Sequence, residues 1–287
     1  MQTAADPGPR PRLVAPPHAC ECHSHIYGPL DRYPYAQGGG RSLHPDASIA
    51  EYRAVLDNLG IERTVIVQPS AYGTDNSRTV DAIREFGADR ARGVAVCAAD
   101  VSHQELSSLH DAGIRGFRFT RQGNDVTLDN LAEVMPRIAP FGWHVQVQDN
   151  GEDAAEWIPR ITDLPVPVVV DHIGRMPRSM DLNDSRFTAF LTLLESGNVW
   201  VKISGPYYGS ASGAPYSDVV PRIRKLAEVR PDRLVWGLNW PHPQFAADQK
   251  PVPAHCLDVL QDAFPDDAAL RKAILCDNPA KLYDFPG

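Results

Sequence analysis

Apolar runs alternate with amphipathic segments along nearly the whole chain. The runs are rich in Val, Ile and aromatic residues and stop at polar or Gly-containing turns, which is typical of strands. We predict strands at residues 18–26, 63–68, 92–98, 114–119, 142–148, 166–172, 198–204 and 232–239. Several of the amphipathic segments have Ser or Asp before the first turn and Gly after the last, which favours helices. Helices are expected at residues 46–60, 77–87, 102–113, 184–197 and 217–229.

Eight strands that alternate with helices predict one closed (β/α)8 barrel of the TIM type. An open, doubly wound sheet is the alternative, but no G-x-G-x-x-G follows the first strand. We expect an N-terminal extension over residues 1–17 and a single barrel domain over residues 18–287. Residues 27–45 and 205–218 are long insertions after the first and seventh strands. They fall at the end of the barrel where active sites lie, so both are candidate lids.

Composition excludes several classes of partner. Hydrophobic residues make up 43% of the chain, the formal net charge is −8, and Lys and Arg are scattered, so we expect no nucleic-acid or membrane partner. No apolar run reaches the roughly 20 residues of a membrane span. Five cysteines are an odd number for a disulfide framework and fit a reducing compartment. We therefore expect a cytoplasmic protein with a small-molecule substrate, and a homo-oligomer is left open.

Histidines gather at the predicted ends of strands on one face of the barrel. His23 and His25 alternate along the first strand, so they point to the same side, where they can bind one cation or contact one substrate oxygen. His172 ends the sixth strand and Asn239 ends the eighth. Asp171 is expected to point away from this group. Ordinary hydrogen-bonded histidines are the alternative for each of them taken alone.

Other polar residues at the same strand ends are candidates for substrate binding. An Arg side chain binds a carboxylate through two parallel hydrogen bonds, and Gln and Tyr side chains add neutral donors and acceptors. The candidates are Gln68, Arg118, Gln146, Arg175, Tyr208 and His242, with Arg121, Gln148 and Tyr207 as further neighbours. Each Arg taken singly is better explained as a surface or helix-capping residue, so the prediction concerns the group.

Six motifs occur in order from about residue 18 to the C-terminus: CECHSHIYGP, VIVQPSAYGTDN, GIRGFRF, VVVDHIGR, WGLNWPHP and LCDNPAKLYDF. Together they resemble the amidohydrolase superfamily, in the branch of 2-pyrone-4,6-dicarboxylate lactonase and related lactone hydrolases. The resemblance implies a (β/α)8 barrel that hydrolyses a lactone or similar cyclic ester. It also implies that His23, His25 and His172 polarise the carbonyl or bind one divalent cation, Zn²⁺ or Mn²⁺, although this branch includes members that work without metal.

Asn239 departs from the resemblance at the residue that would accept a proton from the attacking water. A carboxylate has the basicity for this step, whereas a neutral amide does not. We hypothesise that Asn239 is an engineered, inactivating replacement of Asp in a protein that binds its lactone and turns it over poorly. The alternatives are a natural protein with another base, such as His242 or a metal-bound hydroxide, and a protein that binds without turnover.

The loop after the seventh predicted strand also departs from the resemblance. It has tyrosines and small residues where the lactonase branch has an arginine. We therefore expect a lactone with fewer or differently placed carboxylates, such as a sugar-acid or muconolactone-like ring. Two other activities would use the same residues: a lactone isomerase acting on a sugar-acid lactone, and a metal-dependent decarboxylase or hydratase of the same superfamily.

Overall fold

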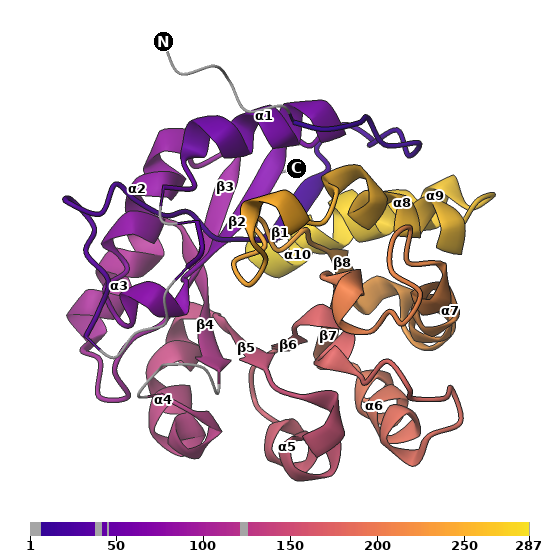
Figure 1. Cartoon of the computed structure of the whole chain (residues 1–287). Helices are drawn as coiled ribbons and strands as arrows, with labels where there is room; N and C mark the ends of the chain where they lie inside the picture. Colours follow the sequence, from indigo (N-terminus) through magenta and orange to yellow (C-terminus); the bar gives the residue numbers. More distant parts are fainter. Residues whose placement is uncertain (1–6, 38–41, 45, 121–125, 287) are drawn as a thin grey trace.

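The computed structural model describes residues 7–37, 42–44, 46–120 and 126–286 as a barrel of parallel strands surrounded by helices (Figure 1). Eight strands follow one another around the sheet in sequence order. They are β1 (Cys20–Ser24), β2 (Arg63–Val67), β3 (Ala91–Ala95), β4 (Ile114–Thr120), β5 (His144–Gln148), β6 (Val168–Val170), β7 (Val199–Ile203) and β8 (Leu234–Trp236). The predicted (β/α)8 barrel is confirmed, and each strand overlaps the range expected from the sequence.

The barrel closes where β1 meets the segment that follows β8. The backbone amide of Asn239 donates to the carbonyl of His23 at 2.7 Å. The buried carboxylate of Glu21 accepts the backbone amides of His23 at 2.8 Å and Leu238 at 2.6 Å. Gly237 lies so close to β1 that a Cβ there would fall 2.8 Å from the Cβ of His23. This contact places His23 and Asn239 side by side, although 216 positions separate them in the sequence.

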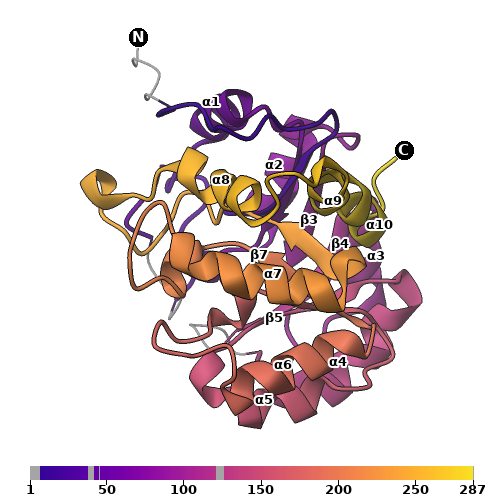
Figure 2. The same cartoon turned by 90° about the vertical axis from the view of Figure 1, so that its right-hand side faces the viewer.

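Helices cover the outside of the sheet (Figures 1 and 2). They are α1 (Ile49–Leu59), α2 (Ser77–Phe86), α3 (His103–Asp111), α4 (Leu131–Ile138), α5 (Ala154–Ile161), α6 (Ser185–Glu195), α7 (Val220–Val229), α8 (Pro253–Ala263), α9 (Ala268–Lys272) and α10 (Asn278–Tyr283). Local signals set their ends. In α1, for example, Ser48 and Glu51 form a capping box, and Gly60 ends the helix with a φ of 72° that favours glycine.

The segments near both ends of the chain pack against the barrel. The C-terminal segment covers the N-terminal ends of the strands, where Arg92 donates to the carbonyl of Tyr283 at 3.1 Å. The segment before β1 is tied to α8, because Asp258 accepts the backbone amide of Leu13 at 3.0 Å. Because the C-terminal segment covers one end of the barrel, a ligand has access at the opposite, C-terminal end of the strands.

Among the described helices, none combines the length and the hydropathy that crossing a bilayer requires.

Candidate active site

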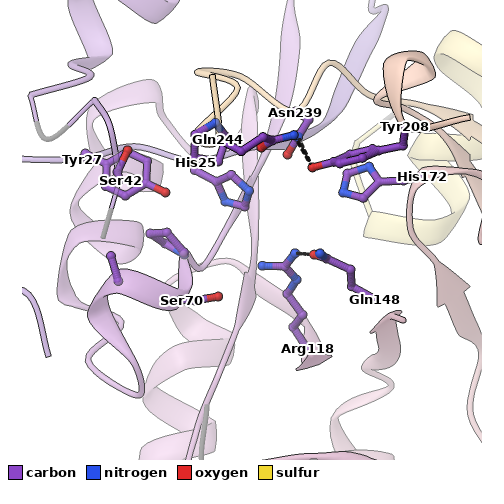
Figure 3. Close-up of a pocket in the computed structure, with 13 residues that line it drawn as sticks. His25, Tyr27, Ser42, Ser70, Arg118, Gln148, His172, Tyr208, Asn239 and Gln244 are labelled. Carbon is purple, nitrogen blue, oxygen red and sulfur yellow. Dashed lines mark hydrogen bonds between the residues drawn. The ribbon is translucent and has the colours of Figure 1, made fainter. Parts of the chain in front are cut away.

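A cavity of about 220 Å³ opens at the C-terminal ends of the strands (Figure 3). Strand ends and the loops after β1, β2, β7 and β8 contribute to its wall. The lining residues are His25, Tyr27, Ser42, Pro69, Ser70, Ala71, Arg118, Gln148, His172, Tyr208, Asn239, Pro243 and Gln244. Within this described lining, Arg118 is the one guanidinium and no Asp or Glu is present. The cavity therefore suits a small anionic ligand.

The structure brings part of the predicted site to this cavity. The predicted residues that line it are His25, Arg118, His172, Tyr208 and Asn239. His23 and Gln146 are fully buried next to it, and the ring of His23 lies 5.0 Å from that of His25 and 4.7 Å from that of His172, centroid to centroid. The lining side chains converge from β4 and from the segments after β1, β6, β7 and β8, as Figure 3 shows.

Four predicted substrate ligands do not line the cavity: the buried Gln146 and the three described next. The side-chain amide of Gln68 donates to two backbone carbonyls of the loop after β2, at 2.8 and 3.1 Å, and so holds that loop. Arg175 stacks on the ring of Tyr208, 4.5 Å from its centroid, and lines a neighbouring surface pocket. His242 lines a different cavity behind the loop that follows β8. Arg121 lies outside the described residues.

Two of the histidines are held through Nδ1. The Nδ1 of His25 lies 2.8 Å from the carbonyl oxygen of Val67, which only accepts, so Nδ1 carries the hydrogen and Nε2 keeps a lone pair. The Nδ1 of His172 lies 2.8 Å from the hydroxyl of Ser204. When that hydroxyl donates, Nε2 of His172 carries a hydrogen. His25 can thus accept a hydrogen bond from a ligand, and His172 can donate one to the same ligand.

Asp171 lies at the centre of the buried group that supports the histidines. Its Oδ1 is 3.2 Å from Nδ1 of His23 and 3.4 Å from Nζ of Lys202. Its Oδ2 accepts the side-chain amide of Gln146 at 2.9 Å and lies 3.6 Å from Nε of Arg118. One carboxylate therefore orders His23 and is balanced by two buried cations.

The expectation that Asp171 points away from the histidines is wrong, because strand alternation stops earlier than predicted. β6 ends at Val170, and His172 turns the chain with a φ of 56°, so both side chains reach the interior. Lys202 did not stand among the predicted site residues, although it is fully buried. Its signal in the sequence is a charged residue within the apolar run VWVKI of β7.

Burial and charge set the protonation of this group. Burial lowers the pKa of His25 and of His172 to about 3. Burial alone would raise the pKa of Asp171, but His23 and Lys202 hold it well below its usual range. Burial also lowers the pKa of Lys202, and Asp171 opposes that shift. Neutral imidazoles therefore surround an ionised carboxylate at neutral pH.

Because five buried histidines are neutral in the folded state, acid is expected to destabilise the fold. Their pKa values lie well below the ordinary 6.5, so between about pH 3 and 6.5 the unfolded chain binds protons that the folded chain does not. Each contributes a slope of up to about 1.4 kcal/mol per pH unit, with stability falling as pH falls. Burial raises the carboxyl pKa of Glu21, so this single group has the opposite effect and stabilises the fold as pH falls. The five are His23, His25, His144, His172 and His242.

Urea unfolding at pH 7 and pH 5 checks this expectation, with a lower midpoint predicted at pH 5. His144→Leu is the matched variant, since it removes one of the five titrating groups while leaving an apolar side chain of similar size next to Gly116. The pH dependence of its unfolding should be shallower than that of the parent chain. Equal midpoints at the two pH values would contradict the assignment of neutral histidines.

Asn239 takes part in a chain of hydrogen bonds that leaves the cavity. Its Nδ2 donates to the hydroxyl of Tyr207 at 2.8 Å and lies 3.4 Å from that of Tyr208. The Tyr207 hydroxyl is 3.1 Å from Nδ1 of His242, to which it can donate. Asn239 has a φ of 65°, a conformation that Asn tolerates better than most residues. The hydrogen bonds and the backbone conformation at this position thus suit an Asn side chain.

The group around Asp171 also bears on a divalent cation. In the described part of the chain, ligand atoms of His23, Asp171 and His172 lie within 4.8 Å of one another, and Nε2 of His23 is buried without a hydrogen-bond partner. Both oxygens of Asp171 are already engaged, however, and Lys202 and Arg118 supply more positive charge than it balances. A divalent ion would add charge with no free carboxylate to offset it. This charge balance argues against a resident divalent cation.

A buried group of histidines with one carboxylate, at the C-terminal end of a (β/α)8 barrel, is the arrangement expected from the sequence motifs. The amidohydrolase family matches residues 20–285, and the chain belongs to it. It is therefore an enzyme of that family.

Relatives of the chain act on lactones. It is 39% identical to a 2-pyrone-4,6-dicarbaxylate hydrolase of Comamonas testosteroni, over 96% of this chain and 92% of that protein. It is 32% identical to a D-galactarolactone isomerase of Agrobacterium fabrum, over 96% of this chain and 94% of that protein. The crystal structure of a protein from Agrobacterium tumefaciens superimposes with a TM-score of 0.89 at 30% identity, covering 97% of this chain and 98% of the other.

Proposed function

We propose that the cavity binds a small carboxylated lactone and hydrolyses its ring ester, slowly because Asn239 stands at the position of the base. The observation that carries this proposal is the lining itself, in which Arg118 and neutral imidazoles face one small space with no carboxylate among the described residues. The relatives named for 2-pyrone-4,6-dicarbaxylate and galactarolactone support a lactone that also carries free acid groups.

The proposed roles follow from the hydrogen-bond partners. Arg118 binds the carboxylate of the lactone, since a guanidinium pairs with it in two parallel bonds. His172, with its hydrogen on Nε2, donates to the carbonyl oxygen as negative charge develops there. His25 offers an Nε2 lone pair to the attacking water, but with a pKa of about 3 it is a weak base. His23 is buried next to His25 and His172, and Asp171 holds it in place.

A binding screen tests the proposal. The chain is titrated by calorimetry with aldaric lactones, muconolactones and 2-pyrone-4,6-dicarboxylate, and each lactone is compared with its methyl ester as a neutral match. The free acid should bind at least about tenfold more tightly, because a buried charge-assisted pair with Arg118 is lost in the ester. If no lactone binds, or if acid and ester bind equally, the proposal is wrong.

Removal of metal ions is expected to leave this function unchanged. Lys202 and Arg118 already supply the positive charge around Asp171, so no divalent ion is needed to balance it. After dialysis against EDTA, lactone affinity and the residual hydrolysis rate should stay within about twofold of the untreated protein, the usual scatter of such measurements. Stoichiometric Zn²⁺ or Mn²⁺ in the purified protein, together with loss of binding on dialysis, would contradict this and favour a decarboxylase or hydratase.

Isomerisation of a sugar-acid lactone is the second candidate, and Asn239 is the observation that favours it. Hydrolysis at neutral pH releases a proton that some base must take. Transfer of the acyl group to another hydroxyl of the same molecule takes a proton from one oxygen and returns one to the other, so it needs no net acceptor. The attacking hydroxyl also belongs to the bound molecule, so no separate water has to be brought into position. NMR of the product distinguishes a rearranged lactone from a hydroxy acid.

A further inference from the structure

A second cavity, of about 560 Å³, lies behind the loop that follows β8. Its wall comes from residues 7–9, from residues 43–44 and 46–55 around the start of α1, and from residues 240–253 between β8 and α8. It shares no described lining residue with the catalytic cavity. Its volume falls in the range of about 300–1,000 Å³ that is typical of small-molecule sites. Neither the proposed reaction nor the sequence motifs assign it a role.

A thin partition separates the two cavities. Along residues 239–244, Asn239 and Gln244 line the catalytic cavity, whereas Trp240 and His242 line the second one. The segment 42–44 also contributes to both, since Ser42 lines the catalytic cavity and Leu43 and His44 line the second one. His44 donates from Nε2 to the carbonyl of Phe245 at 2.7 Å. A ligand in the second cavity would therefore touch the same two segments that shape the catalytic cavity.

One basic side chain, that of Lys250, faces this space without a protein partner, and an unpaired imidazole nitrogen is buried in the wall behind it. Nε2 of His242 is buried and has no hydrogen-bond partner in the described structure. When Tyr207 donates to Nδ1, this Nε2 carries the hydrogen and is an unpaired donor, which is costly to bury. Lys250 is half-buried and forms no ion pair or hydrogen bond among the described residues. It is close enough to His242 to influence the pKa of that imidazole.

The acidic residues of the second cavity form no hydrogen bond or ion pair with Lys250, although the charge of Glu51 opposes the fall in the pKa of Lys250 that burial causes. Glu51 accepts from the backbone amide and hydroxyl of Ser48 through one carboxylate oxygen, at 3.0 and 3.2 Å, and so caps α1. Asp46 is exposed to solvent. The remaining wall is largely apolar and includes Trp240 and Val252. A ligand that complements the cavity carries a negative group for Lys250 and an apolar body for this wall.

We propose that the second cavity binds a small organic carboxylate, held by Nζ of Lys250, with its apolar body against Trp240 and Val252. The site communicates with the catalytic cavity through the chain of hydrogen bonds from His242 to Tyr207 and Asn239. This inference does not depend on which reaction the catalytic cavity performs.

Benzoate is the probe, with benzamide as its neutral match and Lys250→Gln as the variant. Calorimetry should show benzoate binding to the parent chain, with the dissociation constant raised at least about tenfold both for benzamide and in Lys250→Gln, because each change removes one charge of the pair. Lys250 is partly exposed, so its replacement should leave the fold intact, which circular dichroism checks.

Fluorine NMR of protein labelled with 5-fluorotryptophan locates the bound probe. The resonance of Trp240, assigned by Trp240→Phe, should shift on adding benzoate, and this shift should be absent in Lys250→Gln. The inference is overturned if benzoate does not bind the parent chain, if it binds Lys250→Gln equally well, or if it binds while the Trp240 resonance stays in place, which would indicate the catalytic cavity.

Discussion

Replacing Asn239 with Asp is expected to raise the rate of lactone hydrolysis by about 10²- to 10⁴-fold, the usual contribution of general base catalysis. The side chain lines the cavity next to His25 and His172, so a carboxylate there would meet the attacking water. The backbone bond from residue 239 to His23 does not involve the side chain and would persist. The change is measured as kcat/KM on a lactone that the parent chain binds.

The same substitution should reverse the hydrogen bond to Tyr207. The amide of Asn239 donates to this hydroxyl, whereas a carboxylate can only accept, so Tyr207 would turn its hydrogen from His242 to residue 239. His242 would then carry its hydrogen on Nδ1. Nitrogen-15 NMR of the histidines reports this change of tautomer, and it separates a repositioned network from a simple gain of charge.

Gln244→Glu is the matched control, because it makes the same amide-to-acid change at the rim of the same cavity, where Gln244 donates to Tyr208 at 2.5 Å. It should give little gain in hydrolysis. A gain below about tenfold in Asn239→Asp, or an equal gain in Gln244→Glu, would show that residue 239 is not the missing base. If the parent chain is an isomerase, Asn239→Asp should shift its product from rearranged lactone towards hydroxy acid.

Replacing Lys202 with Met is expected to lower the free energy of unfolding by about 3–5 kcal/mol, the cost of leaving one partner of a buried ion pair without the other. Lys202 and Asp171 are fully buried, 3.4 Å apart, and the ammonium also donates to Gln146 at 2.7 Å. Arg118 remains near Asp171, so the lower part of this range is expected. Urea unfolding at pH 7 measures the change.

A double-mutant cycle shows that the loss comes from the pair. Lys202→Met combined with Asp171→Asn should cost less than the sum of the two single changes, because neither member of this pair is then left without the other. Recovery is partial, since Arg118 stays buried without Asp171. Lys225→Met is the control, since Lys225 forms an exposed pair with Glu228 and its removal should cost less than about 1 kcal/mol. Strict additivity of the two buried substitutions would contradict the pairing.

The hypothesis that Asn239 is an engineered replacement stays a prediction. The structure shows that the amide is well accommodated, with a donor bond to Tyr207 and a left-handed backbone that suits Asn. These features favour binding of a lactone with slow or no hydrolysis, whichever origin the residue has. The cytoplasmic location and a homo-oligomer likewise remain predictions.

The sequence by itself determined the barrel and part of the set of residues at its mouth. Alternating apolar runs and amphipathic segments predicted all eight strands, because a strand of a closed barrel must bury side chains on both faces and its helices only one. The two-residue spacing of His23 and His25 placed both near the cavity, because alternate residues of a strand point to the same side. Only the ends of strands were misjudged, since β6 and β8 are shorter than their apolar runs.

The tertiary structure alone decided which polar groups are partners. Asp171, Lys202 and Arg118 come from three different strands or strand ends, and their pairing depends on distances that no local pattern encodes. The same holds for His242, which lies three residues after Asn239 of the catalytic cavity yet lines a second cavity, because the backbone turns at both residues, with φ of 65° and 62°. Periodicity reports burial along one strand, whereas charge balance in a closed barrel arises between strands that are distant in sequence.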